Sequence, residues 1–233
     1  MPTVYYKVHG GRVSFAEYWR LAPDPFSFVI AAGMKLFGGI SFDFSIPRID
    51  ALDIVEWDNI SRKAQKQLAE PMQLFEDAGF QFAFVHELPV LEKHRYGASA
   101  VFLAPDRLTI GMANYFEDKM NKQRAISCVT KFDDGYGFTT TEKKTFVPLP
   151  ESVGFRHPGM PADELYEKHQ GYLEDWERDG KQPLRLSLNT LPAVVMAGEQ
   201  RFVDFHIDRR VFIPMTKAEI RRIRAANEDV DED

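Results

Sequence analysis

Residues 58–146 hold one amphipathic helix pattern followed by five strand-like segments, and this order restricts the folds open to the chain. Asp58 or Ser61 can cap a helix whose apolar side chains recur at helical spacing, namely Ile60, Ala64, Leu68, Met72 and Phe75. Gly79 stands where that helix should end. The strand-like segments are 80–85, 98–103, 108–115, 125–132 and 137–141.

Short connections join these segments. Pro105-Asp106 and Asp133-Asp134-Gly135 supply turn residues, and Gly135 can adopt the left-handed conformation of a hairpin loop. Short connections favour antiparallel neighbours. We therefore predict an α+β fold, an antiparallel β-meander of about four to five strands with helices packed on it.

The flanking parts complete a single domain predicted over residues 1–227. In the N-terminal part, 1–57, the patterns predict a strand at 4–8 and a helix capped by Ser14 and Glu17. In the C-terminal part, 147–227, they predict a helix at 163–179, a strand at 184–188 and a last helix capped by Thr216 and Glu219. Residues 190–212 fit a strand or a helix. Residues 228–233 contain five acids in six positions and predict a disordered tail.

Composition restricts the function classes. The chain carries one cysteine, Cys128, which excludes an intrachain disulfide or a cysteine-based metal cluster and fits a reducing compartment. The net charge is −6, and without the five tail acids it is about −1, so no basic face for nucleic acid is indicated. The first nine residues read as a strand and not as a secretory signal, so we expect a cytoplasmic protein. We expect no bound cofactor and no metal.

The most unusual feature is the apolar stretch 25–42. Its single charge is Lys35, and one helical face carries Phe26, Val29, Ile30, Met34 and Phe37. Gly38-Gly39 should end the helix, which leaves it too short for a bilayer core. Three interpretations stay open: a helix buried in its own domain, a contact with a protein or an apolar ligand, and membrane spanning or interfacial insertion, which is the least favoured.

Polar candidates for chemistry are few. Asp204, His206 and Asp208 would share one face of a strand and could bind a divalent metal or act as an acid–base pair, but they diverge if the segment is helical. A second group, His86, Glu87, Glu92 and His94, gathers near a strand end without a recognisable ligand spacing; they are expected to be loop residues.

Two further residues are better explained by packing. His169 lies on the apolar stripe of its helix and is expected to be a hydrogen-bonded core histidine. Cys128 lies inside a strand without an activating base nearby and is expected to be an inert buried thiol. The chain also lacks the common nucleotide, zinc-protease and serine-hydrolase motifs.

These observations lead to one main hypothesis and two alternatives. We expect a non-catalytic binding or assembly module that acts through protein–protein contact or self-association, with Phe26, Val29, Ile30, Met34 and Phe37 as its contact residues and no assigned catalytic residue. One alternative is a metal-dependent or acid–base hydrolase built around His206. The other is a carrier of an apolar ligand in a cavity lined by some of the 19 phenylalanines.

Overall fold

The chain folds into two compact units, which we describe separately. The computed structural model describes residues 4–21, 25–36, 41–119, 122–143 and 149–228. The large-sheet unit comprises Leu52–Leu88 and Tyr96–Val195. The small-sheet unit comprises Met1–Ala51, Pro89–Arg95 and Met196–Asp233. The prediction of one domain over 1–227 stays a prediction.

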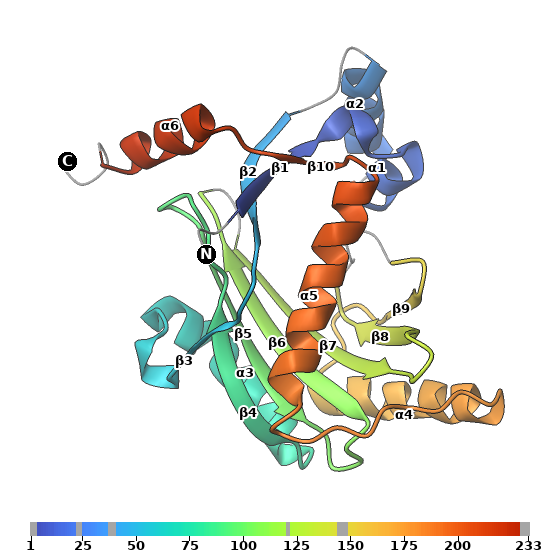
Figure 1. Cartoon of the computed structure of the whole chain (residues 1–233). Helices are drawn as coiled ribbons and strands as arrows, with labels where there is room; N and C mark the ends of the chain where they lie inside the picture. Colours follow the sequence, from blue (N-terminus) through green and yellow to red (C-terminus); the bar gives the residue numbers. More distant parts are fainter. Residues whose placement is uncertain (1–3, 22–24, 37–40, 120–121, 144–148, 229–233) are drawn as a thin grey trace. The chain divides into compact units, whose positions relative to one another are not determined.

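The large-sheet unit is built on a seven-stranded sheet (Figure 1). In sheet order its strands are β3 (Asp53–Val55), β4 (Gln81–Glu87), β5 (Tyr96–Leu103), β6 (Thr109–Glu117), β7 (Lys122–Lys131), β8 (Gly137–Thr141) and β9 (Ser152–Arg156). The predicted meander is present as β4 to β8. The prediction of a purely antiparallel sheet of four to five strands is wrong, because β3 extends one edge and β9 pairs in parallel with β8 at the other.

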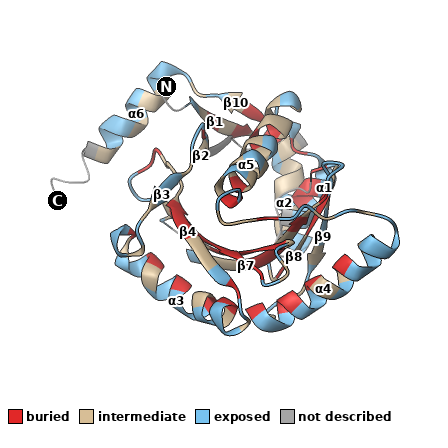
Figure 2. Ribbon diagram, turned by 60° about the horizontal axis from the view of Figure 1, so that its bottom comes forward, coloured by how far each residue is buried: buried red, intermediate tan, exposed pale blue. Residues whose placement is uncertain are grey.

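Two helices cover one face of this sheet, α3 (Arg62–Asp77) and α4 (Ala162–Arg178). The short 3-10 helix η2 (Trp57–Asn59) precedes α3, whose first turn is capped by the Ser61 side chain accepting a hydrogen bond from the Ala64 amide at 3.2 Å. Gly79, with φ of 82°, ends the segment as predicted. Figure 2 shows buried residues along the strands and on the sheet-facing sides of both helices.

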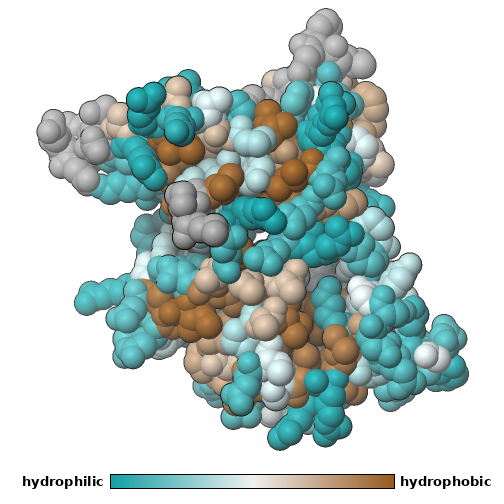
Figure 3. Space-filling model, in the orientation of Figure 1, coloured by the Kyte–Doolittle hydropathy of each residue, from teal (hydrophilic) through white to brown (hydrophobic). Residues whose placement is uncertain are grey.

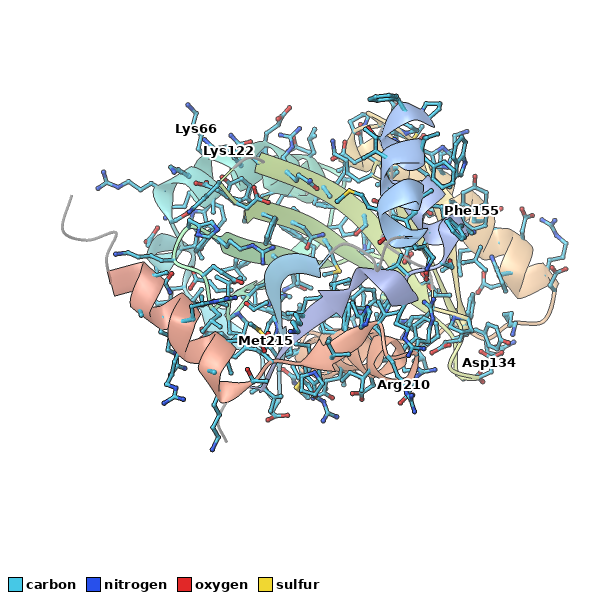
Figure 4. The ribbon with its side chains drawn as sticks, turned by 90° about the horizontal axis from the view of Figure 1, so that it is seen from above. Lys66, Lys122, Asp134, Phe155, Arg210 and Met215 are labelled. Carbon is cyan, nitrogen blue, oxygen red and sulfur yellow. The ribbon has the colours of Figure 1, made fainter. Side chains whose placement is uncertain are left out.

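Aromatic rings fix the distance between α3 and the sheet. The ring of Phe75 lies 5.2 Å from that of Phe102 and 4.9 Å from that of Phe80, measured between centroids. Gly111 on β6 makes room for them, because a Cβ atom there would lie 2.9 Å from the Phe80 ring. At the other end of the sheet Phe155, labelled in Figure 4, stacks on Tyr172 of α4 at 3.9 Å.

His169 joins α4 to the same face of the sheet through hydrogen bonds. Its Nε2 and Nδ1 atoms lie 2.9 Å from the hydroxyls of Thr130 and Thr140, respectively, and its ring stacks on Phe138 at 4.2 Å. The side chain is fully buried. This confirms the prediction of a hydrogen-bonded core histidine. Burial lowers the pKa of His169 from 6.5 to about 3.

The opposite face of the sheet is covered by the first turns of α5 (Leu191–Asp208). Leu191 and Val195 pack on an apolar cluster that includes Phe84, Val101 and Ile110. Of the segment 190–212 left open between strand and helix, residues 191–208 are thus helical, and Phe212 begins a short strand. Ser187 and Thr190 precede it and exchange side-chain-to-backbone hydrogen bonds of 3.3 and 3.0 Å.

The predicted strand at 184–188 is not formed. The amides of Leu184 and Leu186 donate single hydrogen bonds to Lys131 and Arg107, both at 2.8 Å, but no continuous ladder follows. The alternating leucines therefore belong to an extended segment in which Leu186 is buried, and this segment is not a strand of the sheet.

The small-sheet unit contains three antiparallel strands in the order β10-β1-β2. Its elements are β1 (Val4–His9), the 3-10 helix η1 (Gly10–Arg12), α1 (Phe15–Leu21), α2 (Pro25–Leu36), β2 (Ser41–Arg48), β10 (Phe212–Pro214) and α6 (Lys217–Glu228). The Thr216 side chain caps α6 together with Glu219, as predicted. Of the predicted acidic tail, Glu228 ends α6, and residues 229–233 lie outside the described residues.

The buried histidine predicts a pH dependence of stability. The pKa of His169 is about 3 in the folded protein and near 6.5 in the unfolded chain, so below pH 6.5 the unfolded chain binds the extra proton. The contribution of His169 to the free energy of unfolding should thus be largest above pH 6.5 and fall towards pH 3, by as much as a few kcal/mol. Urea denaturation of the wild type and of His169→Gln at several pH values measures it. The difference between the two proteins should be constant above pH 7 and shrink below pH 6.5; a constant difference throughout would contradict the assignment.

Candidate functional site

The candidate site lies on the helical hairpin formed by α1 and α2. The side chain of Ser14 accepts from the Glu17 amide at 3.2 Å, and the Glu17 carboxylate accepts from the Ser14 amide at 2.5 Å, which is the predicted capping box. Glu17 is buried and also accepts from Arg209 at 2.5 Å. Burial alone would raise the pKa of Glu17, but the hydrogen bonds from Arg209 and Ser14 outweigh it and lower the pKa below 4.5.

One side of α2 is attached to α1 and η1. The rings of Trp19 and Phe28 meet edge to face with centroids 5.0 Å apart. The ammonium of Lys35 donates to the backbone carbonyls of Gly11 and Val13 at 2.8 and 2.6 Å. It also lies 5.3 Å from the centroid of the Phe15 ring. Lys35 therefore uses its charge to hold the helix in place.

The other side of α2 is an exposed apolar surface, which we call the α2 stripe: Phe26, Val29, Ile30, Gly33 and Met34. Phe26 is 73% exposed and Val29 64%, and Ile30 and Met34 are about half exposed. Phe37, predicted for the same face, lies outside the residues whose positions are described. In Figure 4, α2 is the light-blue helix, and its side chains project outward from the ribbon.

The α2 stripe is a continuous apolar surface, whereas exposed apolar residues on folded proteins are usually scattered. Hydrophobic residues also reach the surface over the large-sheet unit (Figure 3), which is normal for a folded protein. On α2, however, no residue with a described side chain is buried, and the exposed apolar residues succeed one another along one helix face. The prediction of an apolar helix is confirmed, and of its three interpretations the structure disfavours burial in the helix's own unit.

Two aromatic residues on α1 are also partly exposed, on the side of α2 that carries Phe28 and Lys35, and sequence reasoning missed them. Trp19 is 55% exposed and Phe15 44%. The signal available was their place beside Glu17 and Tyr18, the buried residues of the same short helix. A seven-residue helix that buries the intervening pair has little freedom to turn Phe15 and Trp19 inward as well.

The proposed acid–base group does not form. Asp204, His206 and Asp208 lie on helix α5, where residues two apart point in different directions. His206 is buried, its Nδ1 donates to the Phe202 carbonyl at 2.9 Å, and burial lowers its pKa below 6.5. Asp204 instead pairs with Arg48 at 3.2 Å, and Asp208 is exposed. Among the described residues, no three potential metal ligands come together.

The second polar group is also dispersed. His86 and Glu87 are successive residues of β4, so they point to opposite faces of the sheet, and Glu87 accepts a hydrogen bond from Tyr96. Glu92 is buried and accepts from the amide and the hydroxyl of Ser45, each at 2.7 Å. His94 is exposed. The prediction of an exposed polar loop is therefore wrong for His86 and Glu92, which are buried, and for Glu87, which belongs to β4; it fits His94.

Two buried reactive groups remain. Cys128 is fully buried in the core beside α3, where burial raises the pKa of its thiol, as expected for an inert residue. His86 is 1% exposed, and neither ring nitrogen has a hydrogen-bond partner among the described residues. Ser99, its cross-strand neighbour, donates to Asn114 at 2.6 Å.

Comparison of the chain with protein-family models, with curated proteins and with solved structures found no match. Among the described residues, none of the helices combines the length and apolarity needed to cross a membrane.

The exposure of α2 predicts that a charge on its stripe does not unfold the protein. Val29→Asp should change the free energy of unfolding by less than about 1 kcal/mol, because the new carboxylate stays in water. The matched control is Val203→Asp on α5, a helical valine only 5% exposed, which should destabilise by several kcal/mol through burial of a charge. Urea denaturation followed by circular dichroism measures both. Unfolding by Val29→Asp would show that the stripe belongs to the core.

Proposed function

We propose that this protein is a non-catalytic binding or assembly module, and that the α2 stripe is its contact surface for an apolar surface on another polypeptide. The observation that carries the proposal is the exposure of Phe26, Val29, Ile30 and Met34 along one face of a helix. Contiguous apolar surface of this kind is uncommon on soluble monomers and is typical of interaction sites.

Energetics favour a partner. Full burial of a Val, Ile, Met or Phe side chain stabilises by about 1.5–3 kcal/mol each. Four such side chains together contribute about 6–12 kcal/mol when fully buried, which is the same order as the roughly 4–15 kcal/mol cost of immobilising two molecules, so a partner has to cover the stripe nearly completely. The same area left in water contributes nothing to the stability of the small-sheet unit.

The shape of the surface favours a macromolecule over a small ligand. Small-molecule sites are concave and enclose most of the ligand. A single helix face is convex, and the common way to cover it is to place another helix or a groove against it. Apolar residues at i, i+3, i+4, i+7 and i+8 are the anchors of such helix packing.

The hydrolase alternative gains no support from the residues that suggested it, because Asp204 and His206 take part in a salt bridge and a backbone hydrogen bond on a helix. The carrier alternative would use the interior of the molecule and not the α2 stripe. Neither alternative accounts for the exposed aromatic and aliphatic residues of α1 and α2.

Site-specific photocrosslinking tests the proposal. A benzophenone amino acid placed at Ile30 in the full chain, expressed in cells of its source, should yield discrete covalent adducts on irradiation. The same group at Leu184, a 37% exposed apolar residue of the large-sheet unit, should not. Val29→Asp should abolish the adducts at position 30. Equal yields at the two positions, or no adduct at either, would contradict the proposal.

A further inference from the structure

We propose that the end of α4 is an acid-released flap on the large sheet, and that protonation of the buried His169 side chain frees it while α3 stays in place. The α4 flap comprises residues 169–178 of the helix. Every residue involved lies in the large-sheet unit, so this device is separate from the α2 stripe and its proposed binding function. Three features support it: the hydrogen bonds of His169, the packing of the flap, and a glycine within it.

The partners of His169 hold its imidazole in the neutral form. Nε2 and Nδ1 lie 2.9 Å from the hydroxyls of Thr130 and Thr140, respectively. The Thr130 hydroxyl donates its proton to the Leu108 carbonyl at 3.2 Å, so it accepts from Nε2–H. Nδ1 is then left to accept from the Thr140 hydroxyl. A proton added to Nδ1 would remove this acceptor and place a charge in the core.

The carboxylate of the same network, Asp106, already has a full set of donors. It accepts from the hydroxyls of Thr109 and Tyr166 at 3.0 and 3.1 Å, and from two backbone amides. The hydroxyls of Thr109 and Thr130, 3.4 Å apart, stand between this carboxylate and the histidine. A protonated His169 would therefore be a buried cation without a carboxylate beside it in this network, which strongly disfavours the closed flap.

The other titratable groups around His169 stay uncharged. Cys128 lies across from Thr140 in the pairing of β7 with β8, and Tyr166 lies one turn earlier on α4. Burial raises the pKa of both side chains. α3, which packs beside α4, contributes apolar residues to their shared core. No charged neighbour among the described residues opposes the effect of burial on His169, which lowers its pKa to about 3.

The packing partners of α4 change at His169. Three buried residues ahead of His169 belong to the core that α3 shares, namely Ala162, Leu165 and Tyr166. After His169 only Leu173 is buried, in a separate cluster with Phe132 and Phe138. A segment with few buried contacts can open while the core stays folded. The flap is thus the part of α4 that can be released alone.

Gly171 weakens the helix where the flap begins. It is exposed, and a Cβ atom there would have no neighbour within 4 Å, so no contact in the described part of the molecule requires a glycine. Glycine in a helix is less stable than alanine. Opening at this point would lift His169 off the Phe138 ring, on which it stacks at 4.2 Å. It would also separate Tyr172 from Phe155, whose rings stack at 3.9 Å. Acid would therefore uncover an aromatic surface on β8 and β9.

Hydrogen exchange measures the opening of the flap directly. The pKa of His169 is about 3 in the closed form and near 6.5 once the side chain is exposed, so opening takes up a proton below pH 6.5. The ratio of open to closed flap should then rise about tenfold per pH unit. Between pH 7 and 4.5 the protection factors of the flap amides should fall roughly 50-fold more than those of α3, measured in the full chain by NMR.

Two variants separate the effect of the histidine from that of the helix. His169→Gln takes up no proton in this range, so its flap and α3 amides should change together. Gly171→Ala should raise the protection of the flap about fivefold at both pH values and leave its pH dependence unchanged. Equal loss of protection in the flap and in α3 of the wild type, or a pH dependence of the flap that survives His169→Gln, would overturn the device. Should His169→Gln fold poorly, the wild-type comparison of the flap with α3 decides alone.

Discussion

The packing of α3 against the seven-stranded sheet is the interaction on which the large-sheet unit depends. Phe75, Phe80 and Phe102 form one aromatic group between helix and strands, and the bare backbone of Gly111 admits two of these rings. A side chain at Gly111 would displace Phe80, so the spacing of the two layers is set by this contact. Apolar contacts are not directional, but the hydrogen bonds of His169 to Thr130 and Thr140 are. These hydrogen bonds fix the position of α4 along the same sheet face.

Local signals predicted the parts of the fold that local chemistry determines. Ser61, Gly79 and the spacing of Ile60, Ala64 and Leu68 define α3, and Asp133-Asp134-Gly135 correctly predicts the turn into β8, where Gly135 has a φ of 84°. The two strands missed at the sheet edges have other causes. β3 is three residues long, and the parallel pairing of β9 with β8 is set by tertiary contact and not by a hairpin turn. In α5, Val203 and Phe205 alternate with polar residues as in a strand, but Val195, Val203 and His206 are buried at helical spacing.

The candidate site was predicted in part for the same reason. The periodicity of Phe26, Val29, Ile30 and Met34 is sufficient to predict an apolar helix face, but periodicity does not say what covers that face. Coverage depends on what else packs on the small sheet, and its buried residues come from the strands, from α1 and from Val203 and His206 of α5, while α2 contributes none with a described side chain. The predicted polar groups do not form, because they were inferred from residue type and not from the direction in which each side chain points. Asp204 and His206 share a face only on a strand, and they lie on a helix; His86 and Glu87 are successive residues of a strand and point to opposite faces of the sheet.

Lys35 explains why the apolar face of α2 is turned outward. The helix is apolar nearly all round, so hydrophobicity alone would allow several rotations about its axis. Rotating the stripe towards α1 would carry Lys35 away from the carbonyls of Gly11 and Val13, and those two hydrogen bonds to a charged donor would be lost. The contact of Trp19 with Phe28 would be lost in the same movement. A single charged side chain thus selects one rotation of an otherwise uniform helix, and that rotation leaves Phe26, Val29 and Ile30 exposed.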